Sequence, residues 1–218
     1  MIAVDGPDGA GKSTHVALLR DWLVERGTPC EVVSKWDALD VERLPENRFL
    51  RGTTREEFRV CVAEMPTPAR SMFILWMYAA TAARAVRLSA SRLVLLDGFW
   101  MKHAAAELAY GADRRLIETM VAGLPAIDTV FYLDVEPAEA LRRKGDALTP
   151  YECGLDRRLD GSKFLRLQQQ IRTTLLGWAH RDGWQIIPAG PVDRAQADLR
   201  KRILAALPAT ANLVTADE

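Results

Sequence analysis

The sequence predicts an α/β protein with a doubly wound, parallel five-stranded sheet. Five short apolar runs alternate along the chain with longer segments that have helical periodicity. The runs are apolar at nearly every position, which is typical of strands in a parallel sheet that helices cover on both faces. We expect a single domain over residues 1–206, followed by a flexible tail at 207–218, where the apolar period is lost.

The first half of the chain begins with an apolar strand and an amphipathic helix. Strands are expected at residues 1–5, 30–34 and 92–97, and helices at 12–26, 54–64 and 69–88. Val16, Leu19 and Leu23 share one face of the first helix, and Gly27 ends it. The third helix is apolar enough to run through the interior of the domain. Residues 35–52 are polar and irregular, and a loop of this length indicates a function.

The second half of the chain continues the alternation. Strands are expected at residues 129–135 and 184–188, and helices at 103–110, 113–123, 137–143, 162–181 and 191–206. Pro137 stands in the first turn of its helix, where proline is well tolerated. Residues 144–161 are polar and rich in turn formers, so we expect a small lid there.

The composition argues against several classes of protein. The chain has 29 acidic and 29 basic residues, so no overall charge favours binding to nucleic acid or to a membrane. No run approaches the roughly 20 apolar residues that a membrane-spanning helix needs. Cys30, Cys61 and Cys153 form no CxxC pair, which indicates reduced thiols. With no apolar leader before residues 1–5, we expect a soluble, cytoplasmic protein.

Residues 6–14, Gly-Pro-Asp-Gly-Ala-Gly-Lys-Ser-Thr, match the phosphate-binding pattern G-x-x-x-x-G-K-[ST]. Glycines let successive backbone N–H groups approach phosphate oxygens, and the following helix adds its positive end. Lys12 is expected to reach the β- and γ-phosphates, and the Ser13 hydroxyl to bind Mg²⁺. The sequence therefore predicts ATP and Mg²⁺ as cofactors. The expected contacts are Gly6, Asp8, Gly9, Ala10, Gly11, Lys12, Ser13 and Thr14.

A P-loop of this kind occurs in several classes of nucleotide-binding protein. The chain has no Asn-Lys-x-Asp motif, which reads guanine in GTPases, and no Leu-Ser-Gly-Gly signature of transporter ATPases. Its size and the turn-rich stretch 144–161 suit a nucleotide kinase, in which a lid closes to exclude water. We therefore expect ATP-dependent phosphoryl transfer to a small-molecule acceptor.

Several stretches resemble the thymidylate kinase family of P-loop nucleoside monophosphate kinases, namely residues 2–14, 75–80, 93–97, 128–137 and 140–143. The resemblance implies the strand order 2-3-1-4-5 and a dTMP-like acceptor. It also implies that Arg143 packs on the adenine ring. Arg157 follows Asp156 in a step that resembles the family lid, where it would stabilise charge on the transferred phosphoryl group. A homodimer is left open.

The chain departs from this family at groups that clamp the acceptor phosphate and read thymine. Gly98 follows Asp97, at a position where the family has an arginine. Thr81 stands on the long helix at a position where the family usually has a second arginine. Residues 34–37 replace a Glu-Pro-Gly element. Other cations could replace the missing groups, and the candidates are Lys35, Arg48, Arg51, Arg70 and Arg84. Alternatively, the acceptor is a nucleoside or another metabolite with a hydroxyl group, or the chain binds ATP without catalysis.

The remaining candidates follow the ends of the predicted strands. Asp97 lies at the sheet edge where ligands bind, and would hold Mg²⁺ through water or orient the acceptor. Asp8 would contact the acceptor or the metal, or only stabilise the turn. Asp37 is a base for an acceptor hydroxyl or a solvated loop acid. The expected catalytic residues are Lys12, Asp37, Asp97 and Arg157, with Ser13 and Asp97 as metal ligands. The expected substrate-binding residues are Lys35, Trp36, Arg70, Tyr78, Arg84 and Trp100.

Overall fold

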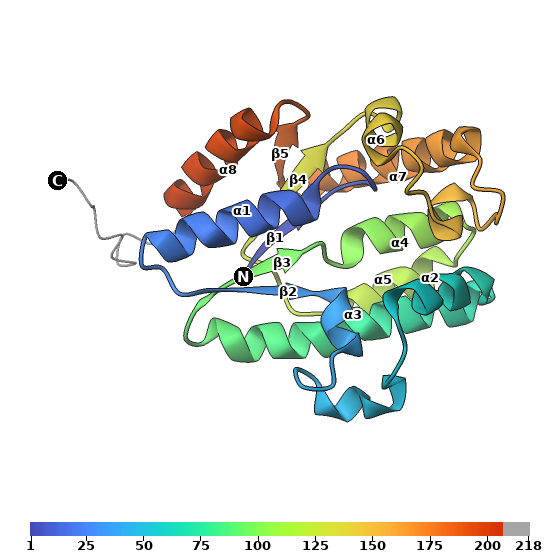
Figure 1. The fold of residues 1–218 in the computed structure, drawn as a ribbon, viewed down its shortest axis with the longest axis horizontal. Coiled ribbons are helices and arrows are strands. Elements are labelled where there is room, and N and C mark those ends of the chain that lie inside the picture. The colour runs from blue at the N-terminus through green and yellow to red at the C-terminus, as the bar shows by residue number, and fades with distance from the viewer. Residues whose placement is uncertain (207–218) are drawn as a thin grey trace.

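The computed structural model describes residues 1–206, and the tail expected at 207–218 lies outside this range. Within it, the chain forms a parallel five-stranded sheet with the order β2-β3-β1-β4-β5. The strands are β1 (Ile2–Asp5), β2 (Cys30–Ser34), β3 (Leu93–Asp97), β4 (Thr129–Asp134) and β5 (Gln185–Pro188). Figure 1 shows helices on both faces of the sheet. The predicted doubly wound fold and its strand order are confirmed.

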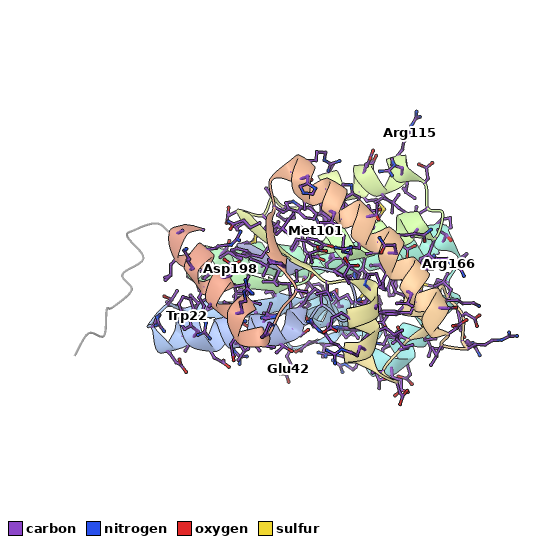
Figure 2. The ribbon with its side chains drawn as sticks, turned by 90° about the horizontal axis from the view of Figure 1, so that it is seen from above. Trp22, Glu42, Met101, Arg115, Arg166 and Asp198 are labelled. Carbon is purple, nitrogen blue, oxygen red and sulfur yellow. The ribbon has the colours of Figure 1, made fainter. Side chains whose placement is uncertain are left out.

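Two groups of helices cover the sheet (Figure 1). On one face pack α1 (Lys12–Glu25) and α8 (Val192–Ala206), whose Leu19 and Leu199 share a core. The other face carries α3 (Thr67–Ser89), α4 (Trp100–Ala109) and α7 (Gly161–Asp182). Figure 2 shows Met101 of α4 in the interior and Arg115 of α5 (Arg114–Ala122) pointing outward. Each strand therefore has apolar neighbours on both sides, as its composition requires.

The central position of β1 places the P-loop at the switch point of the sheet. Ile2 pairs with Leu95 of β3 on one side and with Thr129 of β4 on the other. The chain leaves the carboxyl end of β1 through the P-loop turn and enters α1 at Lys12. In open α/β sheets, ligands bind at the carboxyl ends of the strands where the strand order reverses. The fold alone thus directs attention to this edge.

The structure corrects several predicted boundaries. Residues 35–52, expected as an irregular loop, contain the 3₁₀ helices η1 (Lys35–Leu39) and η2 (Pro45–Leu50). Helix α3 begins at Thr67 and not at residue 69, because Pro68 fits the first turn, where its missing N–H leaves no helical bond unmade. Helix α4 begins at Trp100, three residues before the expected start. The bounds of α2 (Arg55–Glu64) and α6 (Pro137–Lys144) agree with prediction to within one residue.

The segment between α6 and α7, expected as a lid at 144–161, carries the short 3₁₀ helix η3 (Pro150–Cys153). This helix contacts α2 and α7. Thr149 and Glu152 cap it reciprocally, and Lys144 Nζ lies 3.1 Å from a carboxylate oxygen of Glu152. Throughout the part of the chain that the structure describes, no helix combines the length and apolar character needed to cross a membrane.

Candidate functional site

The P-loop turn packs so tightly that its glycines are needed. A Cβ on Gly6 would lie 2.7 Å from the carbonyl oxygen of Leu133, and one on Gly9 would lie 2.8 Å from that of Ala140. Gly9 also has a φ of 82°, a conformation that residues with a Cβ rarely adopt. The turn is therefore held between β4 and α6 with its backbone accessible. Such a cradle fits a polyphosphate, whose oxygens accept from backbone N–H groups.

Lys12 holds its ammonium group within this turn. Its Nζ donates to the carbonyl oxygens of Gly6 and Pro7, each at 2.8 Å. Burial lowers the pKa of Lys12, against the opposing effect of the nearby Asp8. A partly buried ammonium group within a P-loop turn is suited to bind the terminal phosphates of a nucleotide.

Asp5 is a buried acid at the end of β1 that the sequence analysis counted only as part of a strand. Its carboxylate accepts from the backbone N–H groups of Gly6, at 2.7 Å, and Phe99, at 2.9 Å. Burial raises the pKa of Asp5 despite the opposing charge of Lys12. Asp5 thereby ties the start of the P-loop to the chain that leaves β3. An acid directly before the first P-loop glycine was the signal that could have identified it.

Asp8 is fastened to two helices that come from distant parts of the sequence. Lys102 Nζ of α4 lies 3.0 Å from Asp8 Oδ1. Gln168 of α7 donates to Asp8 Oδ2 at 3.2 Å, and its amide oxygen accepts from the Asp8 backbone N–H at 3.0 Å. Burial would raise the pKa of Asp8, but Lys102 and Lys12 more than offset this and lower it. Sequence reasoning missed both partners, although Lys102 follows Asp97 by little more than a helical turn.

A cavity of about 210 Å³ opens between the P-loop, η1, α2, α3 and α4, and we call it the sheet-edge cavity. Ser13 and Asp97, the expected metal ligands, both line it. The four cationic side chains on its wall are Lys12, Lys35, Arg59 and Lys102. Its apolar wall includes Trp36, Phe58, Val62 and Ile74. The cavity can therefore receive an anionic group and an apolar ring in the same small volume.

Three side chains in this cavity form a hydrogen-bonded chain. Lys35 Nζ lies 2.6 Å from His103 Nε2, and His103 Nδ1 lies 2.8 Å from the Tyr78 hydroxyl oxygen. Burial, followed by the charges of neighbouring lysines, lowers the pKa of His103 well below its usual value. Burial likewise lowers the pKa of Lys35. Lys35 and Tyr78 were expected to bind substrate, whereas His103 was not a candidate.

A second, wider opening of about 880 Å³ lies on the other side of the P-loop, and we call it the outer cleft. Gly9, Gly11 and Thr14 line it together with Arg143 of α6. Arg143 Nε donates to Glu139 at 2.7 Å, which holds the guanidinium group over the helix. The structure thus brings Arg143 into the same cleft as Gly9, Gly11 and Thr14 of the P-loop.

Other sequence candidates lie outside the sheet-edge cavity. Arg70 is 1% exposed and pairs with Glu107, its Nε lying 2.9 Å from the carboxylate. Trp100 packs against Trp178 with ring centroids 5.7 Å apart. Arg157 pairs with Glu64 at the surface. These contacts give Arg70 and Trp100 structural partners and leave Arg157 away from the P-loop in this conformation.

Asp37 and Arg84 neutralise each other instead of facing the sheet-edge cavity. Arg84 lies 3.2 Å from Asp37 and 3.0 Å from Glu31, and Arg43 lies 3.0 Å from Asp37. Burial raises the pKa of Asp37, although the two arginines oppose this. The remaining cationic candidates, Arg48 and Arg51, are exposed. Of the five cations proposed from sequence to bind an acceptor, only Lys35 lines the cavity.

The donor atoms at the sheet edge fit Mg²⁺ bound in the company of phosphates. Ser13 supplies a hydroxyl and Asp97 a carboxylate on the same cavity wall. Within residues 1–206 no three His, Cys, Asp or Glu side chains cluster as a metal site. Mg²⁺ is commonly held by only one or two protein oxygens, with water and substrate phosphates completing its shell. The Ser13 hydroxyl and the Asp97 carboxylate are therefore the kinds of oxygen donor that such a Mg²⁺ site needs.

Among curated proteins, thymidylate kinases are similar to this chain in sequence. No protein-family model matches the chain. A probable thymidylate kinase of Archaeoglobus fulgidus is 27% identical over 206 residues, covering 93% of this chain and 94% of that protein. The thymidylate kinase of Shewanella loihica is 28% identical over 216 residues and covers 94% and 93%. That of Chlorobaculum tepidum is 32% identical over 158 residues, 66% of each chain.

A solved structure supports the same fold. The crystal structure of thymidylate kinase from Ehrlichia chaffeensis superposes with a TM-score of 0.60, covering 93% of this chain and 97% of that one. The two sequences are 15% identical, so this likeness concerns the fold alone.

Proposed function

This chain is thymidylate kinase-like in sequence and in fold, and from that premise we propose that it transfers the γ-phosphoryl group of ATP to a nucleoside monophosphate-like acceptor in the sheet-edge cavity. Its similarity to thymidylate kinases supports a nucleotide kinase in the broad sense, that is, a phosphotransferase. The use of ATP and the nature of the acceptor are the proposal.

The observation that carries the proposal is the set of cations on the cavity wall. Lys35, Arg59 and Lys102 reach it from three different elements and join Lys12 of the P-loop. The residue after Asp97 is a glycine, and Lys102 supplies positive charge a turn later on α4. Lys102 already pairs with Asp8, but Lys35 and Arg59 pair with no carboxylate among residues 1–206, so an anionic ligand would supply the partner that they lack. A phosphate monoester would provide that charge, and Trp36 and Phe58 offer aromatic surface for its base.

In the proposed reaction, a phosphate oxygen of the acceptor attacks the γ-phosphorus, and ADP leaves. The P-loop amides and Lys12 would hold the donor, while Lys35, Arg59 and Lys102 would hold the acceptor phosphate in line with it. Ser13 and Asp97 would hold Mg²⁺, which would neutralise charge on the donor phosphates. The attacking oxygen is already an anion, so no general base is required. The pairing of Asp37 with two arginines is compatible with this reaction.

A kinase that phosphorylates a hydroxyl group is the second candidate. The cavity volume of about 210 Å³ lies below the roughly 300 Å³ at which pockets for drug-sized ligands begin. A small cavity favours a small acceptor, such as one that carries a hydroxyl group and no phosphate. A non-catalytic ATP-binding protein is the third, and it predicts nucleotide binding without any product.

An acceptor panel separates the three candidates. Phosphorylated product and ADP release would be measured with dTMP, the other nucleoside 5′-monophosphates, and thymidine. We expect product from a monophosphate and none from thymidine; product from the nucleoside alone would favour the second candidate. Lys102→Met should raise the acceptor KM roughly tenfold to a hundredfold, the value of hydrogen bonds to a charged group. Lys201→Met, on the exposed side of α8, is the matched control.

A further inference from the structure

The chain Lys35–His103–Tyr78 contains three groups that the proposed reaction does not need as acids or bases. The residues come from the start of η1, from α4 and from α3, so only the tertiary fold brings them together. Tyr78 and His103 are 2% and 5% exposed, so their polar atoms depend mainly on partners within the protein. The His103 ring also packs between the rings of Tyr78 and Tyr151, at centroid distances of 5.5 and 5.7 Å. The imidazole is therefore fixed in place with both nitrogens engaged.

A neutral imidazole has one N–H donor and one acceptor, and two arrangements of this chain differ in the charge of Lys35 and in the His103 tautomer. In the first, Lys35 is an uncharged amine that accepts from Nε2–H, and Nδ1 accepts from the Tyr78 hydroxyl. In the second, Lys35 is an ammonium group that donates to Nε2, and Nδ1–H donates to the Tyr78 oxygen. The second arrangement contains one more proton, carried by Lys35, and His103 remains neutral in both.

The charges around the chain decide which arrangement the cavity favours. Those acting on Lys35 are Lys102, Asp8, Arg59 and Lys12, and those acting on His103 are Lys102, Lys35 and Lys12. The acids Asp5, Asp97 and Asp8 act on Tyr78. Burial is the main cause that lowers the pKa of Lys35, and the charges of Lys102, Arg59 and Lys12 add to it against the opposing charge of Asp8. A bound dianion would reverse this balance, because an opposite charge within about 4–6 Å favours the charged form.

We propose that binding of a dianionic phosphate monoester in the sheet-edge cavity is coupled to uptake of a proton by Lys35, with His103 as the positioning residue that changes its hydrogen-bond direction. The inference rests on the proposed function. The proton comes from solvent, the amine becomes an ammonium group, and the imidazole changes tautomer. The Tyr78 hydroxyl group keeps its proton but no longer donates it to His103 Nδ1. Both Lys35 and Tyr78, which line the cavity, can then donate to the anion.

This coupling makes the charge of the acceptor a criterion for binding. A neutral nucleoside cannot compensate the added charge on Lys35, so it leaves the chain in its uncharged arrangement. The sign of the pH dependence follows from the proton taken up. Where a full proton is taken up, acceptor affinity falls about tenfold for each unit by which pH rises.

The test is titration calorimetry of deoxynucleoside monophosphates, dTMP first, into the full chain saturated with ADP and Mg²⁺. The measurement at about pH 8 uses buffers of different ionisation enthalpy, since the acceptor phosphate, with a second pKa near 6, is then already a dianion. The dependence of the heat on the buffer gives the protons taken up per acceptor. We expect net uptake in the wild type and none in Lys35→Met, which is titrated at acceptor concentrations high enough to offset its weaker binding.

Variants of His103 test its positioning role. His103→Phe should weaken acceptor binding roughly tenfold to a hundredfold, because the Lys35 ammonium group loses a buried partner. His103→Gln keeps an acceptor for Lys35 and should recover most of the affinity. ADP affinity should be unchanged in both. His180→Gln, on the exposed side of α7, is the control.

The outcomes separate this inference from the function on which it rests. Monophosphate binding without proton uptake in the wild type would overturn the coupling and leave the proposed function intact. Proton uptake that persists in Lys35→Met would show that another group takes up the proton, and it would also overturn the coupling. Wild-type affinity in His103→Phe would remove the role of the imidazole. If no monophosphate binds, the proposed function falls, and the coupling falls with it.

Discussion

Replacing Glu107 by glutamine tests the buried ion pair that occupies Arg70. The two side chains are each 1% exposed, and the carboxylate accepts from Arg70 Nε at 2.9 Å. The same carboxylate accepts from the hydroxyls of Ser71, at 2.7 Å, and Tyr151, at 2.9 Å. Glutamine has nearly the same shape but no charge. The substitution therefore leaves the Arg70 guanidinium group buried without its counterion.

The expected loss is large because removing one member of a buried pair leaves an uncompensated charge. Such changes cost roughly 3–5 kcal/mol in the free energy of unfolding. Arg70 keeps partial support from the carbonyl oxygen of Met65, at 2.8 Å, and from the ring of Tyr110, whose centroid lies 5.0 Å away. We therefore expect a value near the lower limit, about 3 kcal/mol.

Urea unfolding followed by tryptophan fluorescence measures this loss. The midpoint should fall while the slope with denaturant stays constant, which shows a change in stability and not in the surface exposed. Glu118→Gln breaks an exposed pair with Arg114, 3.6 Å apart, and should change stability by no more than about 1 kcal/mol. The double variant Arg70→Met, Glu107→Gln should be more stable than Glu107→Gln alone, because no charge remains unpaired.

A loss below about 1 kcal/mol for Glu107→Gln, or a double variant no more stable than the single one, would refute this reasoning. It would mean that the Arg70 charge is solvated, and Arg70 would again be available as a ligand for the acceptor.

Lys12→Met should reduce phosphoryl transfer at least a hundredfold in a product assay, because the ammonium group held in the P-loop stabilises charge on the transferred group; turnover near wild type would contradict a role in transfer. Asp37→Asn should reduce turnover less than about tenfold, since two arginines occupy this carboxylate outside the cavity, and a loss of a hundredfold or more would identify it as a general base. The pKa of Asp8 is lowered from 3.8, since the charge of neighbouring lysines more than offsets the effect of its burial. The Asp8 carboxylate therefore stabilises the fold above about pH 3.8, and this contribution is lost as the pH falls toward the lowered pKa. Acid unfolding of Asp8→Asn should lack this component, and an unchanged acid profile would contradict the assignment.

Much of the fold was predictable because it depends on short-range patterns. The P-loop spacing, the apolar strand before it and the amphipathic helix after it all lie within residues 1–26. The error at Thr67 arose because a proline stands in the first turn of α3, and the start at Trp100 lies three residues before the expected one. The strand order required the resemblance to a known family, because local periodicity does not determine which strands are neighbours.

The acceptor side was less predictable because it depends on which face each helix presents. Lys102 and His103 are adjacent in sequence, yet one meets Asp8 of the P-loop and the other meets Lys35 and Tyr78. Nothing in their local pattern distinguishes them from solvent-facing residues. A helix face becomes a cavity wall only when a second element packs against it.

The sequence by itself determined the P-loop turn, the strand before it and the helix after it. These depend on consecutive residues, whose backbone geometry is set locally. Tertiary structure alone decided which charges are available to a substrate. Arg70 meets Glu107 and Arg84 meets Asp37 and Glu31 across 37 to 53 positions, which removes these arginines from the site. Long-range packing instead placed Lys35, Arg59 and Lys102 on the cavity wall, where Lys102 pairs with Asp8 of the P-loop.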